Sequence, residues 1–167
     1  MMELSTRTLG DWLEHWALTT PDKEYIVYSD RNLRFTWKQF NERVDHMAKG
    51  LLAIGVKWGT HVGIWAGNVP DWLTFLYACA KIGAVAVTVN TNYKQAELEY
   101  LCQNSDMHTL CIVDGEKDSS FVDMTYTMLP ELKTFQRGHL KSKRFPYMRN
   151  VIYIGQEKYR GMYNTAE

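Results

Sequence analysis

The 167-residue chain is 46% hydrophobic and 13% aromatic, which is enough apolar material for a folded core. Nineteen basic residues balance nineteen acidic residues, so overall charge gives no reason to expect nucleic acid or an anionic membrane as a partner. No apolar run is long enough for a transmembrane segment, and the first residues lack the layout of a signal peptide. Three cysteines without paired spacing argue against a disulfide framework, and we expect a cytoplasmic location.

Residues 1–60 are predicted to form a helix, a β-hairpin and a second helix. Thr8 and Asp11 are spaced as a cap for a helix over residues 9–18. Two β-prone runs, 25–28 and 33–35, follow with a short turn between them. Thr36 and Gln39 form a capping box for the second helix, which Gly55 is expected to stop.

From residue 61 onward, predicted strands and helices alternate. The strands are predicted at 61–65, 84–89, 109–113 and 151–154, and the helices at about 70–82, 95–103 and 120–129. Asn92 and Gln95 are candidate caps of the middle helix. The continuous apolar run 84–89 is typical of a strand covered on both faces. This alternation predicts an α/β fold with a mostly parallel sheet flanked by helices, and residues 61–167 form a predicted βαβ subdomain.

The chain offers no self-contained set of catalytic residues. It lacks a Walker-type phosphate loop, a G-x-G-x-x-G turn and a G-x-S-x-G elbow. Cys79 and Cys111 lie in a predicted helix and a predicted strand, where a small core residue is the favoured interpretation. His108 and Cys111 would point to opposite faces of a strand, and the other histidines are scattered, so no metal site is predicted.

One stretch, residues 133–144, has an uneven charge. It contains five basic residues and no acidic one: Lys133, Arg137, Lys141, Lys143 and Arg144. A solvated loop is the favoured interpretation, and a site for a phosphate-rich ligand or nucleic acid is the alternative.

Six short motifs occur in an order that resembles the AMP-forming acyl-CoA synthetases of the adenylate-forming superfamily. They are Thr20-Pro21-Asp22-Lys23; Phe35-Thr36-Trp37-Lys38-Gln39-Phe40; Gly50 to Val56; Val62 to Trp65 followed by Asn68 to Trp72; Ala80 to Val85; and Asn90 to Leu101. The resemblance covers residues 8 to about 113. The segments 130–133 and 150–158 are similar to the fatty-acyl branch of the family. Thr60 stands where the family usually has an aspartate.

The resemblance implies that this chain is the N-terminal part of the large domain of a medium- or long-chain fatty acid–CoA ligase. Such an enzyme joins a fatty acid to CoA at the expense of ATP, with magnesium, through an acyl-adenylate. The family's ATP-binding loop and C-terminal domain follow the matched region, so the resemblance carries no catalytic residue into this chain. We therefore expect an inactive fragment that holds no cofactor tightly, partners the rest of the synthetase chain, and self-associates through uncovered apolar surface.

The same resemblance places a turn, Asn90, Thr91, Asn92 and Tyr93, along the path of CoA. The acetate-using branch holds the CoA nucleotide with arginines whose positions fall near Asp118 and Phe121, so that contact is expected to be absent or supplied by Lys117. The alternative for the turn is a purely structural role. The alternative for the whole chain is a free-standing α/β nucleotide-binding or interaction module.

Overall fold

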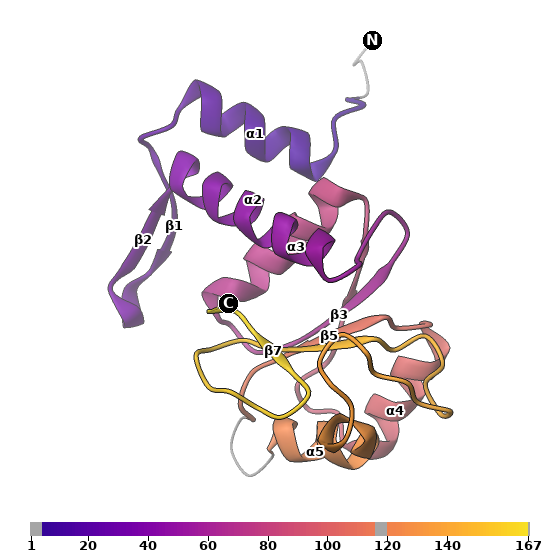
Figure 1. Cartoon of the computed structure of the whole chain (residues 1–167). Coiled ribbons are helices and arrows are strands. Elements are labelled where there is room, and N and C mark those ends of the chain that lie inside the picture. Colours follow the sequence, from indigo (N-terminus) through magenta and orange to yellow (C-terminus); the bar gives the residue numbers. More distant parts are fainter. Residues whose placement is uncertain (1–4, 116–119, 167) are drawn as a thin grey trace.

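The computed structural model describes residues 5–115 and 120–166. A five-stranded sheet lies in the middle of the molecule, with α1, α2 and α3 on one side and α4 and α5 on the other (Figure 1). A two-stranded hairpin lies beside the first layer as a separate sheet. The α/β architecture predicted from the alternating pattern is confirmed.

The N-terminal layer is built from two well-capped helices and the hairpin between them. In α1 (Leu9–Thr19) and α2 (Trp37–Ala53), the Thr8–Asp11 and Thr36–Gln39 capping boxes form as predicted. The antiparallel strands β1 (Glu24–Tyr28) and β2 (Leu33–Thr36) are joined by a 3-10 turn, Ser29–Arg31. Gly55, with φ of 90°, follows α2 in the left-handed region that glycine adopts most readily.

The large sheet is entirely parallel, in the order β4-β3-β5-β6-β7. Its strands are β3 (His61–Trp65), β4 (Val85–Thr88), β5 (Thr109–Ile112), β6 (Asn150–Tyr153) and β7 (Tyr163–Asn164). The connecting helices are α3 (Pro70–Ile82), α4 (Gln95–Asn104) and α5 (Phe121–Met128), with a 3-10 turn at Pro130–Lys133. Pro70 begins α3, where its missing N–H costs nothing.

Alternation of side chains along the strands divides the interior into two cores. Val62 and Ile64 of β3 join the core beneath α1, α2 and α3. Trp65 of the same strand joins the other core, which includes Leu98 of α4 and Phe121 of α5. Because successive strand residues point to opposite faces, one strand serves both cores.

Two local predictions were wrong, and one short strand was missed. The run 84–89 was predicted to be covered on both faces, but β4 is an edge strand and Val85 is 43% exposed. Asn92 does not cap α4; that position belongs to Lys94, whose backbone N–H donates to the Glu97 carboxylate. The two-residue strand β7 was missed, because two residues are too few to show a period.

Candidate functional site

The loops that follow the strands meet at the carboxyl edge of the sheet. The chain leaves β3 for α3 on one face, whereas it leaves β4 and β5 for α4 and α5 on the other face (Figure 1). In open α/β sheets, ligands bind outside the carboxyl ends of strands at such a switch point. The candidate site is therefore made by the segments after β3, β4 and β5.

The segment after β4 is the Asn90–Tyr93 turn. The backbone N–H of Tyr93 donates to the carbonyl of Asn90 at 3.1 Å. The backbone N–H of Asn92 donates to the Asn90 side-chain oxygen at 2.9 Å. Such side-chain bonds to the backbone two residues on are typical of asparagine turns. The side chains of Asn90 and Asn92 are exposed, whereas Thr91 and Tyr93 are half-buried.

Trp65, the last residue of β3, holds this turn against the sheet. Its indole N–H donates to the carbonyl of Asn90 at 3.2 Å. Its ring stacks on Phe121 with centroids 3.8 Å apart and planes 8° apart. Both rings are fully buried, and burial of each contributes roughly 2 kcal/mol. Trp65 thus ties the turn to the first residue of α5.

Burial of Phe121 bears on the expected CoA nucleotide contact. Phe121 lies near a position where the acetate-using branch was expected to have an arginine, and its ring is fully buried here. Lys117, the residue considered for that contact, and Asp118 lie outside the described residues.

Asp114 provides a carboxylate at the same edge, although no sequence motif pointed to it. It follows β5, and its Oδ2 accepts a hydrogen bond of 3.0 Å from the Tyr153 hydroxyl. Burial of Tyr153 raises the pKa of its phenol well above the ordinary value, and the bond to Asp114 adds to this shift. Tyr153 therefore stays protonated as a donor that orients Asp114. Its only signal in the sequence is its place at the end of the apolar run 109–113.

A hollow of about 410 Å³ opens beside the end of β3. It is lined by Ala66, Gly67, Asn68, Val69, Trp72 and Leu73. Its walls are mostly apolar, so it can accept an uncharged portion of a ligand and offers little to bind a phosphate group.

Cys79 and Cys111 are core residues, as predicted, and Cys102 is a core residue too. Cys79, Cys102 and Cys111 are buried, and burial raises the pKa of the Cys79 and Cys102 thiols to about 12. Thiols with such pKa values are poor nucleophiles near neutral pH. Within residues 5–115 and 120–166, no group of three His, Cys, Asp or Glu residues is arranged to hold a metal ion. No helix in the same part of the chain is both long and apolar enough to cross a membrane.

The family model of AMP-binding enzymes matches residues 13–144. This chain belongs to the AMP-binding enzyme family. YngI of Bacillus subtilis (strain 168), named a putative acyl-CoA synthetase, is 45% identical over 98% of this chain and 30% of its own length. The human protein named medium-chain acyl-CoA ligase ACSF2, mitochondrial, is 33% identical over 90% of this chain and 25% of its own length. The chain thus spans less than a third of either relative.

Solved structures of AMP-binding enzymes share the fold. The long-chain-fatty-acid-CoA ligase FadD1 of Archaeoglobus fulgidus superposes with a TM-score of 0.72 at 22% identity, covering 93% of this chain and 29% of that one. The N-terminal domain of FACL13 from Mycobacterium tuberculosis gives a TM-score of 0.71 at 19% identity, covering 89% of this chain and 34% of that one. The sheet and its flanking helices therefore correspond to part of the N-terminal domain of such ligases.

Proposed function

We propose that this chain is the N-terminal part of a medium- or long-chain fatty acid–CoA ligase. The complete enzyme would convert ATP, a fatty acid and CoA into acyl-CoA, AMP and pyrophosphate. The family match and the relatives named as acyl-CoA synthetases or ligases support the reaction class. The name of ACSF2 supports a medium-chain substrate, and that of FadD1 a long-chain one.

Within that enzyme, Asn90, Thr91, Asn92 and Tyr93 form part of the wall of the CoA path. One observation carries this role: the turn lies at the carboxyl edge with two exposed amide side chains, while Trp65 fixes its backbone from below. A backbone held in this way presents polar groups without a large ordering cost on binding. Amide side chains suit the uncharged, amide-containing arm of CoA.

The remaining components belong to the rest of the synthetase chain. That part would supply the groups that hold ATP, magnesium and the fatty acid, so these 167 residues alone would neither form the adenylate nor bind a cofactor tightly. The complete protein would act in the cytoplasm, without nucleic acid as a partner. Exposed Leu18 and Trp58, at 83% and 84%, support self-association of the isolated chain.

The two half-reactions allow a sharp test of the CoA wall in the complete synthetase. Exchange between ATP and pyrophosphate requires only adenylate formation, whereas thioester formation requires CoA. Asn92→Asp places a negative charge beside a negatively charged ligand without removing a described side-chain bond. We expect KM for CoA to rise several-fold, with exchange unchanged.

The matched control is Asn104→Asp, the same change at an exposed residue at the other end of α4. An unchanged KM for CoA in Asn92→Asp, or an equal loss of both half-reactions, would contradict the proposed wall. The isolated chain should show no exchange at all, and measurable turnover would show that it contains catalytic groups after all.

A further inference from the structure

The basic stretch 133–144 does not behave as one uniform patch. Lys133 lies over the ring of Tyr126 at 5.4 Å, and Arg137 over the ring of Tyr163 at 5.3 Å. Arg144 forms an ion pair with Glu99 of α4. These three side chains already have neighbours that stabilise them.

The other two basic residues of the stretch, Lys141 and Lys143, line a hollow of about 490 Å³. Arg149 and His139 line it too, and no acidic side chain of the described residues does. Neither lysine forms an ion pair within the described part of the chain. The basic residues around the hollow carry charge of one sign, so an anion in the hollow would be attracted to them.

Ser142, between the two lysines, adds an observation independent of charge. Ser142 is one of the residues that line the hollow, and it is only 7% exposed. Its hydroxyl oxygen is buried and has no hydrogen-bond partner among the described residues. Buried polar atoms are rarely left in this state, because an unpaired hydroxyl costs about 1–3 kcal/mol. A ligand with oxygen acceptors would pair it.

Arg149 also lines the hollow, and its guanidinium group is held in place by hydrogen bonds. Its Nη1 donates to the carbonyls of Pro146 at 2.7 Å and Met148 at 2.9 Å, which holds the guanidinium in place. The guanidinium has five N–H donors, so others remain for a ligand. Arg149 also contributes, after burial, to the lowered pKa of His108, which indicates a positive potential at this edge.

We propose that this hollow binds the phosphate group of a small organic phosphate. Two ammonium groups, a held guanidinium and a hydroxyl provide charge-assisted donors suited to phosphate oxygens. The volume falls in the range of small-molecule sites. The lining contains no Phe, Tyr or Trp, so the large stacking surfaces typical of nucleic-acid sites are missing from it.

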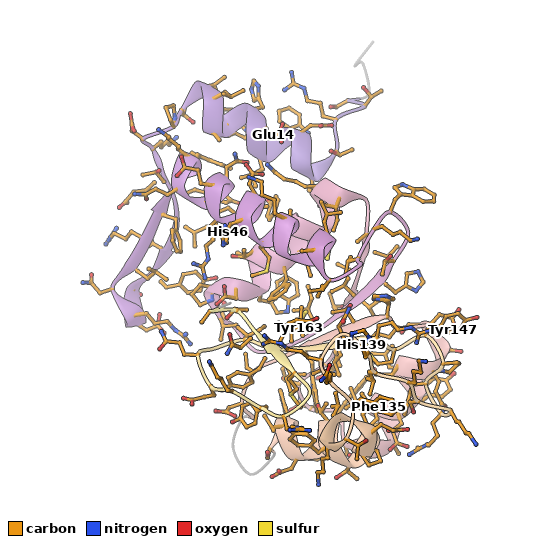
Figure 2. The ribbon with its side chains drawn as sticks, in the orientation of Figure 1. Glu14, His46, Phe135, His139, Tyr147 and Tyr163 are labelled. Atoms are coloured by element: carbon orange, nitrogen blue, oxygen red, sulfur yellow. The ribbon has the colours of Figure 1, made fainter. Side chains whose placement is uncertain are left out.

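The hollow is separate from the candidate CoA wall. Arg149 directly precedes β6 and therefore lies at the amino edge of the sheet, whereas Asn90–Tyr93 follow β4 at the carboxyl edge. Figure 2 shows His139 and Tyr147 of the same loop, with Tyr147 at the end of the molecule that faces away from the C-terminus. A ligand here would accompany the proposed CoA ligand rather than compete with it.

The test is an NMR titration of the ¹⁵N-labelled 167-residue chain with inorganic phosphate and with glycerol 3-phosphate at constant ionic strength. We expect saturable shifts at the amides of residues 139–143 and 149. The double variant Lys141→Gln/Lys143→Gln should raise Kd at least about tenfold. Ser142→Ala should raise Kd about threefold without lowering Tm, because its hydroxyl has no partner to lose.

The control is Lys38→Gln/Lys49→Gln, which removes the same charge from exposed positions on α2. The site would be overturned if both double variants raised Kd for the phosphate ligands equally. It would also be overturned if the amide shifts were spread over lysines throughout the chain, because both results indicate a diffuse charge effect. Binding to phosphatidylserine vesicles without saturable shifts by either phosphate would overturn it in favour of a lipid surface. Tight binding of glycerol 3-phosphate that the Lys141→Gln/Lys143→Gln variant retains would also reject it.

Discussion

The ammonium group of Lys81 lies 2.6 Å from the Asp45 carboxylate, although the lysine side chain is only 8% exposed. Lys81 belongs to α3 and Asp45 to α2. The same ammonium group also contacts Glu14 of α1 at 3.0 Å and the Asn41 side-chain oxygen at 2.7 Å. One cation therefore joins the three helices of the N-terminal layer, in which Figure 2 labels Glu14.

Replacing this cation should destabilise the fold. Lys81→Met keeps much of the aliphatic stem but leaves the Asp45 carboxylate without its partner. We expect a loss of about 2 kcal/mol in the free energy of unfolding, measured by urea denaturation. Glu14→Gln serves as the comparison, because Glu14 is 58% exposed and its removal should cost less than about 1 kcal/mol. Equal losses in the two variants would contradict a central role for Lys81.

Trp65 should control the mobility of the candidate CoA wall. Trp65→Phe removes the indole donor to Asn90, and we expect a loss of about 1–3 kcal/mol in stability together with faster hydrogen exchange at residues 92–93. Phe121→Leu is the matched variant, since it removes the stacking partner while keeping the indole N–H. Slow exchange at residues 92–93 in Trp65→Phe would show that the turn does not depend on this bond.

Stability should depend on pH through His108. Burial, then Arg149 and Lys57, lowers the pKa of His108 in the folded chain below its ordinary value of 6.5. The unfolded chain therefore binds more protons in this window, and stability is full above about pH 6.5 and falls as pH drops toward the folded-state pKa. His108→Gln should reduce this slope in urea midpoints measured from pH 7.5 to 5. The exposed His46 gives the control, His46→Gln; an unchanged slope in His108→Gln would assign the dependence to other groups.

The three cysteines should resist modification in the folded chain. Burial raises the pKa of all three thiols, so few are thiolates near pH 8. A thiol reagent such as 5,5′-dithiobis(2-nitrobenzoate) should react slowly with the native protein. In concentrated urea it should react rapidly with all three thiols. Rapid labelling of one cysteine in the native chain would show that its surroundings open readily.

Local signals predicted most of the elements. The caps at Thr8 and Thr36 form because they depend only on residues three positions away. Apolar runs likewise marked β3, β5 and β6. These features require no knowledge of distant parts of the chain.

What the sequence could not show depends on partners far along the chain. An apolar run such as 84–89 does not reveal whether a neighbour covers it, so the edge position of β4 was missed. The same holds for Asp114 with Tyr153, and for Arg144 with Glu99, whose partners lie 39 and 45 residues away. The hollow at Lys141 and Lys143 was also missed. The sequence does not show that Lys133, Arg137 and Arg144 have neighbours of their own, whereas these two lysines line the hollow.

The division of the interior into two cores follows the order of synthesis. Nearly all of the core beneath α1, α2 and α3 comes from residues before 87, with only a few strand residues such as Cys111 and Ile152 added later. In the core beside α4 and α5, Trp65 is the only fully buried member among the described residues 5–86. A nascent chain leaving the ribosome can therefore assemble much of its first layer before the second layer has been translated. Phe121, the ring that stacks on Trp65, is translated only with this second layer.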